Sequence, residues 1–257
     1  ASSFDRDFDW TSWRIGSVFK LADNVAAYAQ YSDAKDPVNS NIFLVNGGED
    51  LDLTDAEQWE IGLKGALPEV GVEATVAYFD IQRDDVIEQI GIDSATNVGG
   101  RESNGLEVTG TWAASEQLKF GVNAAQTKAE FSRSTNFQNF AGNTPPNVPE
   151  RTANLWASYN FSDLPLTLGG AFRYVGDRFG DNANDVTLKS YSLIDAYASW
   201  KHNNLTISAR VNNAADEEYV SWSDVFYLGQ TDPSFIYANQ LLLGAPRTFE
   251  VSIAASF

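Results

Sequence analysis

The side chains that most often do chemistry are few and scattered in this sequence. Cysteine is absent, and the chain has one histidine, His202. This composition excludes a disulfide framework, a thiolate zinc site, an iron–sulfur cluster and a cysteine nucleophile, and a serine–histidine relay would depend on a single ring. His202 lies in a short polar segment, so we interpret it as a satisfied or solvated turn residue.

The acidic clusters have the wrong spacing for catalysis. The pairs at 84–85 and 217–218 are adjacent in sequence, and neighbours in a strand point to opposite faces, so neither pair forms an acid–base couple. The segment 181–185 offers oxygen ligands that suit Ca²⁺, but it lacks the twelve-residue loop pattern and its closing glutamate. We interpret it as a solvated turn and 49–52 as an exposed acidic loop. With no phosphate-binding loop, G-x-S-x-G or H-E-x-x-H motif, we expect no enzyme activity, no resident cofactor and no metal site.

Charge and composition exclude some partners and indicate whether the chain is processed. The chain has 17 basic and 35 acidic residues, a formal net charge of −18, which argues against nucleic acid as a partner. No run approaches the ~18 consecutive apolar residues of a membrane-spanning helix. The chain has no methionine and opens on Ala1 with no leader-like segment, so we expect a processed chain or a fragment.

The dominant hydrophobic period is two. Segments such as 71–79, 152–161, 204–213 and 248–257 alternate Ala, Leu, Val, Ile or aromatic residues with Thr, Ser, Asn or Glu, and Trp156 is an exception on a polar face. Alternate side chains of a strand point to opposite faces, so each segment predicts a strand with one apolar and one polar face. About 11 strands are predicted in this way: 10–20, 24–33, 56–66, 71–89, 96–113, 117–132, 151–161, 165–177, 189–201, 203–220 and 246–257.

The predicted connections alternate between short and long. Tight turns separate one set of strand pairs, whereas the other set is joined by long segments at 34–55, 133–150, 178–188 and 221–245 and a short one near 90–95. An all-β, antiparallel up-and-down transmembrane β-barrel has this layout, with aromatic residues near the strand ends. Alternation alone does not say which face meets which medium, so a soluble β-sandwich stays open at this point.

Several segments, in order along the chain, then resemble one family. Residues 58–65 resemble a strand-entering E-x-G-x-K segment, 101–108 an R-S-x-G-x-E element, 143–151 a proline-rich strand entry, and 211–219 a V-x-N-L-F-D-x-x-Y element. The last departs from the pattern at Ala214 and Ala215, where Leu and Phe are usual. With 77–81, 173–176, 191–195, 244–248 and the terminal Phe257, these segments are similar to the C-terminal barrel half of TonB-dependent outer-membrane receptors, above all the ferric-siderophore receptors.

The resemblance implies a fold, a function and partners. Such receptors have 22 strands around a plugged lumen, so residues 1–257 would be the C-terminal part of the barrel, with the plug domain and the N-terminal strands absent. The implied function is energy-coupled uptake of a ferric siderophore across the outer membrane of a Gram-negative bacterium. The implied partners are the chelate, the TonB complex acting through the missing N-terminal region, and outer-membrane lipid and lipopolysaccharide.

The family binds its chelate at the extracellular mouth, where aromatic faces and polar donors would be needed. The candidate ligand contacts are Trp222, Phe226, Tyr227, Phe235, Tyr237, Phe137, Phe140, Arg133 and Arg178. These aromatic residues could instead pack against one another or against the outer leaflet. Two other functions stay open: a passive porin-type channel, and a secreted β-sandwich module that stacks its aromatic residues on sugars.

Overall fold

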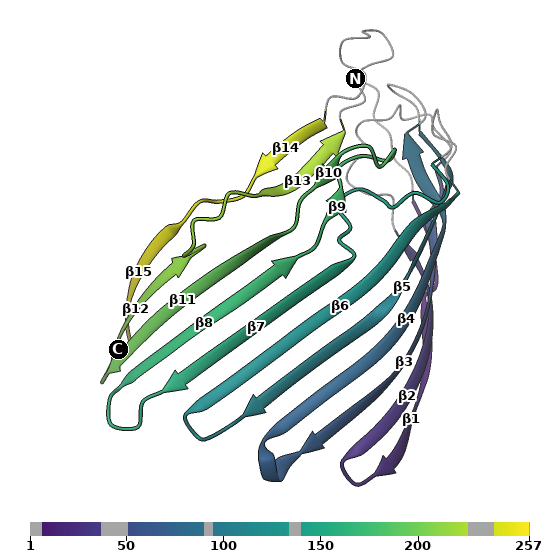
Figure 1. The fold of residues 1–257 in the computed structure, drawn as a ribbon. Coiled ribbons are helices and arrows are strands. Elements are labelled where there is room, and N and C mark those ends of the chain that lie inside the picture. Colours follow the sequence, from purple (N-terminus) through teal and green to yellow (C-terminus); the bar gives the residue numbers. More distant parts are fainter. Residues whose placement is uncertain (1–6, 37–50, 90–94, 134–139, 226–238, 257) are drawn as a thin grey trace.

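The protein folds into one large curved antiparallel sheet (Figure 1). This computed structural model describes residues 7–36, 51–89, 95–133, 140–225 and 239–256. Eleven strands pair in the order β1-β2-β3-β4-β5-β6-β7-β8-β11-β12-β15. Their bounds are β1 Trp13–Ala22, β2 Val25–Asp36, β3 Thr54–Leu67, β4 Val72–Gln89, β5 Ala95–Ala113, β6 Leu118–Arg133, β7 Arg151–Asn160, β8 Leu166–Val175, β11 Tyr191–His202, β12 Leu205–Asn212 and β15 Thr248–Ala255.

The tight turns gather at one end of the sheet and the long connections at the other (Figure 1). The turn between β3 and β4 is a short 3-10 segment, Pro68–Val70, closed by Gly71 at φ 69°. A Cβ on Gly71 would lie 2.4 Å from the Ala113 carbonyl oxygen, so the position accepts only glycine. We call this end the turn end and the opposite one the loop end.

The long connections contain two further hairpins at the loop end. One consists of β9 (Arg178–Phe179) and β10 (Thr187–Leu188), and the other of β13 (Val220–Val225) and β14 (Asn239–Leu243). Each pairs only within itself and forms a two-stranded sheet beside the loop end of the large sheet (Figure 1).

The two faces of the sheet differ in chemistry and in exposure. Along β3, Trp59 and Ile61 are 59% and 56% exposed, and Ile61 faces Tyr78 in the register with β4. The alternate residues of β4 on the other face include Ala77 and Phe79, which are 7% and 8% exposed. We call the exposed apolar face the outer face and the opposite, mainly polar one the inner face. A continuous uncovered apolar face of this extent needs an apolar medium rather than water.

The inner face is built partly from aromatic rings that lie over glycines of a neighbouring strand. A Cβ on Gly121 would lie 2.1 Å from Nε1 of Trp156, its register partner on β7. In the same way, Tyr197 of β11 covers Gly169 of β8 at 2.3 Å. The exception that Trp156 makes to the alternation therefore has a packing reason, because its indole occupies the space that Gly121 leaves empty.

The predicted strands are confirmed, with one clear difference. The strand expected over 203–220 ends at Asn212, since Asn213 and Asp216 take positive φ values of 49° and 58° and turn the chain. Pairing resumes at Val220 in a separate hairpin. The sandwich alternative is wrong, because all the long strands lie in one sheet. Among the described residues, no helix is long and apolar enough to cross a membrane.

Candidate functional site

The loop end is held together by asparagine side chains that pair with the backbone of another loop. Asn147 donates from Nδ2 to the Ser223 carbonyl at 2.6 Å, and its Oδ1 accepts the Ser223 amide at 2.8 Å. The Ser223 hydroxyl, which is buried, donates to the Gly180 carbonyl at 2.9 Å. The proline-rich entry to β7, the β9–β10 connection and the β13–β14 hairpin therefore meet at Ser223.

A second asparagine joins two of the same loops. The amide of Thr144 donates to Oδ1 of Asn184 at 2.9 Å, and Nδ2 of Asn184 donates to the Thr144 carbonyl at 2.8 Å. Asn143 adds a hydrogen bond from its Nδ2 to the Asn182 carbonyl at 2.9 Å. Asp181 closes the intervening turn, since its Oδ1 accepts the Asp185 amide at 3.0 Å. The carboxylate of Asp181 is thus engaged in local turn structure.

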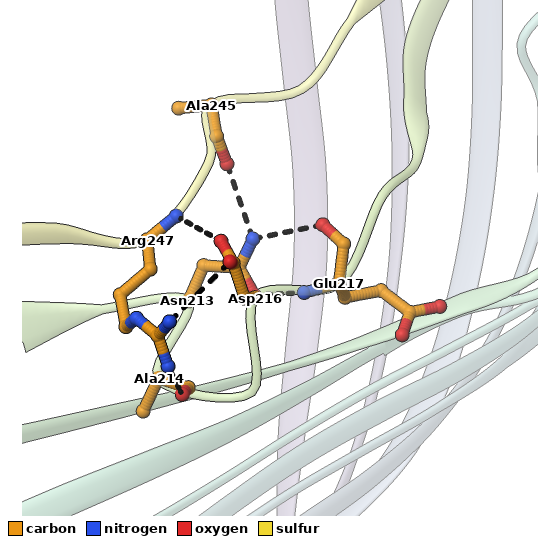
Figure 2. A network of polar contacts seen from close by, with 6 residues as sticks. All are labelled: Asn213, Ala214, Asp216, Glu217, Ala245 and Arg247. Carbon is orange, nitrogen blue, oxygen red and sulfur yellow. Dashed lines mark hydrogen bonds and ion pairs between the residues drawn. The ribbon is translucent and has the colours of Figure 1, made fainter.

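A third asparagine, Asn213, organises the chain between β12 and β15 (Figure 2). Its Nδ2 donates to the carbonyls of Glu217 at 2.9 Å and Ala245 at 3.1 Å, and its Oδ1 accepts the Glu217 amide at 2.9 Å. Arg247 adds a second layer, because its amide donates to Oδ1 of Asp216 at 2.9 Å. These contacts tie the turn after β12 to the segment that leads into β15.

Arg178 lies among these cross-linked loops, between β13 and β11. Its side chain is buried, at 4% exposure, and its Nη2 donates to the Val220 carbonyl. The guanidinium carbon lies 5.4 Å from the centre of the Tyr191 ring, and that ring lies 4.3 Å from the ring of Tyr219. Arg178 therefore joins the base of the β13–β14 hairpin, through its hydrogen bond, to β11, through its cation–π contact.

The predicted ligand contacts fall into different environments. Trp222 is 54% exposed on β13, opposite Leu242. Arg133 is exposed at the loop end of β6, where its Nη2 forms an ion pair with Asp84 at 2.8 Å. Phe140 is half-buried, and its carbonyl accepts the Asn143 amide at 2.9 Å. Phe137, Phe226, Tyr227, Phe235 and Tyr237 lie outside the described residues.

Arg178 and Trp222 belong to the same set of cross-linked loops, because Arg178 binds β13, the strand that carries Trp222. Arg133 lies separately, at the loop end of β6 beside β4. A cavity of about 360 Å³ lies beside Arg178 and is lined by apolar side chains such as Val148 and Phe179 together with hydroxyls and charges of both signs. They include Thr127, Thr144 and Asp177. Such a lining can hydrogen-bond water or a polar group. Over the part of the chain that the structure describes, no three acidic or histidine side chains gather as a metal site would require.

Sequence reasoning missed Asn147, Asn184 and Ser223. Asn147 and Asn184 lie in the segments 143–151 and 181–185, but the partners of all three residues lie 40 to 76 residues away along the chain, so no local pattern indicates these contacts. Asn213 carried a signal, because it is the asparagine of the V-x-N element at 211–213.

Comparison with known proteins then decides the family. The family model described as "TonB dependent receptor-like, beta-barrel" matches residues 1–214. The chain belongs to this family. The resemblance noted in the sequence is thereby confirmed.

Individual relatives agree with this assignment. The chain is 29% identical over 231 residues to the ferrichrome outer membrane transporter/phage receptor of Escherichia coli K12, covering 84% of this chain and 30% of that protein. It is 27% identical over 229 residues to the ferrioxamine B receptor of Salmonella typhimurium, covering 86% of this chain and 32% of that protein. The chain thus spans about a third of the length of these relatives.

Solved structures share the fold. The siderophore receptor PiuA from Acinetobacter baumannii superposes with a TM-score of 0.75 at 22% identity, over 94% of this chain and 35% of that chain. The ferric yersiniabactin uptake receptor FyuA from Yersinia pestis superposes with a TM-score of 0.76 at 18% identity, over 95% of this chain and 37% of that chain.

Proposed function

We propose that this chain is the C-terminal part of the barrel of an outer-membrane receptor that binds a ferric siderophore and takes part in its energy-coupled import. The observation that carries the proposal is the two-sided sheet of eleven strands, with a cross-linked set of loops at one end, in a member of the TonB-dependent receptor family. Relatives named as ferrichrome and ferrioxamine B receptors support a siderophore as the cargo.

The geometry of the loop end suits binding of an organic chelate. Trp222 offers a half-exposed aromatic face on a hairpin that Asn147 and Arg178 already hold in place. A surface that is ordered before binding loses little conformational entropy when the ligand arrives. Trp222 is accordingly our first ligand contact, and the remaining candidates predicted from the sequence keep that role as part of the proposal.

The two faces of the sheet define the other partners. The outer face would meet outer-membrane lipid and, near the loop end, lipopolysaccharide. The inner face, with its Thr, Asn and charged side chains, would line a lumen filled by a plug domain encoded outside this chain. Contact with the TonB complex would likewise come from a region outside it. The loop end then faces the exterior and the turn end the periplasm of a Gram-negative cell.

The test uses the intact receptor that contains this chain, purified in detergent and titrated with a panel of ferric hydroxamates and ferric catecholates. We expect at least one of them to bind and to quench tryptophan fluorescence. Trp222→Ala should weaken that binding about tenfold, the effect of ~1.4 kcal/mol and within the range of aromatic contacts at binding sites. Trp200→Ala, at the turn end of β11, is the matched control and should leave affinity unchanged.

Iron uptake by cells provides the second arm. Uptake of the bound chelate should stop when the TonB complex is deleted. Uptake that continues without that complex would instead support a passive channel, and failure to bind every ferric chelate in the panel would overturn the proposed cargo.

A further inference from the structure

The outer face carries a groove of about 790 Å³ that crosses the neighbouring strands from β4 to β11. Its floor consists of Ala157, Gly170 and Ala196, which are register partners on β7, β8 and β11. The next register row toward the loop end carries the larger side chains of Leu155, Phe172 and Ile194, which form one wall. The groove exists because three successive strands place small residues beside a row of large ones.

The groove runs obliquely from the turn end toward the middle of the sheet. It begins at Trp112, one residue before the end of β5, passes Ala157, three residues from the end of β7, and reaches Ala196, six residues from the end of β11. With a rise of ~3.3 Å per residue and a tilt of ~45°, six residues rise about 14 Å along the membrane normal. This is about half of the ~30 Å hydrocarbon thickness of a bilayer.

The lining side chains that point outward are apolar, whereas the other lining residues, such as Glu73, Thr109 and Asp195, alternate with them along the strands and belong to the inner-face rows. The lining residues that point outward are Val72, Ala74, Val108, Gly110, Trp112, Phe120, Val122, Leu155, Ala157, Gly170, Phe172, Ile194 and Ala196. The one polar atom among their side chains, Nε1 of Trp112, donates to the Val70 carbonyl at the adjacent turn. That tryptophan marks the level at which an apolar body meets a polar interface.

We infer that this groove binds an acyl chain of a phospholipid from the periplasmic leaflet, with the headgroup near Trp112 and the chain directed to the bilayer midplane. The inference rests on the proposed function, which places the outer face in hydrocarbon and the turn end at the periplasm. The groove is continuous with that hydrocarbon-facing surface and takes the course of a chain that descends from headgroup level. A concave apolar surface gives each methylene more contacts than a flat one, so a chain in the groove exchanges less readily than its neighbours. Lipid A of the opposite leaflet enters from the loop end and does not fit this course.

The test is retention of lipid by the intact receptor after extraction in mild detergent, read by native mass spectrometry. Ala157→Leu combined with Ala196→Leu fills the floor of the groove. Ala27→Leu combined with Ala29→Leu is the matched control, because both alanines lie on the outer face of β2, away from the groove. We expect the native receptor and the control to retain one phospholipid, and the filled variant to retain it at least tenfold less.

Each outcome decides the inference. Equal retention by the filled variant and the control would overturn it, as would lipopolysaccharide as the retained lipid. If the double variant does not fold, as judged by heat-shifted mobility on a gel, Ala196→Leu alone is compared with Ala29→Leu in vesicles that contain a brominated phospholipid. A bimane label at residue 157, introduced as Ala157→Cys, should then be quenched less in the Ala196→Leu background, and equal quenching contradicts the site.

Binding of ferric chelates by the same preparations separates the two proposals. If the filled variant loses the phospholipid but still binds the ferric chelate, the result supports lipid binding in the groove and leaves the proposed function intact. A receptor that retains the phospholipid but binds no ferric chelate refutes the cargo alone.

Discussion

Asn213 offers the sharpest test of how the loop end is held together. Replacing it by alanine removes three side-chain hydrogen bonds, two to the carbonyls of Glu217 and Ala245 and one from the Glu217 amide. Asn213 is 4% exposed, so water does not replace them without opening the turn. At about 1 kcal/mol for each bond, the local opening free energy should fall by ~3 kcal/mol. The positive φ of 49° adds about 1 kcal/mol of strain for alanine.

The measurement is amide hydrogen exchange of the intact receptor in lipid vesicles, followed by mass spectrometry of peptides that cover 213–220. The Glu217 amide reports directly, because it donates to Oδ1 of Asn213. The ~3 kcal/mol from the hydrogen bonds corresponds to exchange faster by on the order of 100-fold, and the added strain brings Asn213→Ala to on the order of 1,000-fold. Asn213→Gly removes the strain but keeps the loss of the three hydrogen bonds, so its exchange should be faster by on the order of 100-fold.

The control is Asn203→Ala in the turn between β11 and β12. Asn203 also has a positive φ, 51°, but it is exposed, and its side chain makes no hydrogen bond with the described residues. It therefore isolates the cost of strain, and exchange around it should rise by less than about tenfold. If Asn213→Ala changed the Glu217 exchange rate no more than Asn203→Ala changes the rate in its own turn, the assigned role of Asn213 would be refuted.

Two further predictions concern the sheet itself. Gly121→Ala should lower the stability of the folded receptor by ~1–3 kcal/mol in urea titrations, because the new Cβ would displace Trp156, whereas Gly110→Ala meets its nearest atom at 3.4 Å and should be nearly neutral. Ile61→Arg on the outer face should cost about 2–4 kcal/mol on folding into vesicles, whereas Thr109→Arg on the inner face should cost little, and equal costs would contradict the assignment of the two faces.

The strands could be predicted because their signal is local. Alternation in segments such as 152–161 and 204–213 fixes both the strand and its faces within a few residues, since successive side chains must point to opposite sides. The end of β12 was misplaced for a different reason. The segment after Asn212 keeps strand-like composition near Tyr219 and Val220, and the turn between them depends on positive φ values that composition does not reveal.

The candidate site was less accessible to the same reasoning. An arginine after a strand predicts an exposed donor, yet Arg178 is buried because Val220, 42 residues later, supplies its acceptor and Tyr191 its aromatic face. The exposed position of Trp222 likewise follows from the hairpin partner of β13 rather than from its neighbours in sequence. Side-chain roles that depend on contacts between loops therefore cannot be predicted from local patterns, although the family resemblance indicates the loops in which such residues lie.

The loop end also shows why asparagine occurs where it does. A loop has few apolar groups to bury, so its order must come from satisfied polar groups. Asn147, Asn184 and Asn213 all have positive φ, which asparagine tolerates better than most residues, and each pairs through its carboxamide with the backbone of a residue in another segment. Glycine would supply the backbone geometry without the bridge, and aspartate would supply acceptors without the donor. Only a side chain that tolerates this geometry and carries a donor and an acceptor in one plane can replace a missing strand partner, which is how these loops stay ordered without a core of their own.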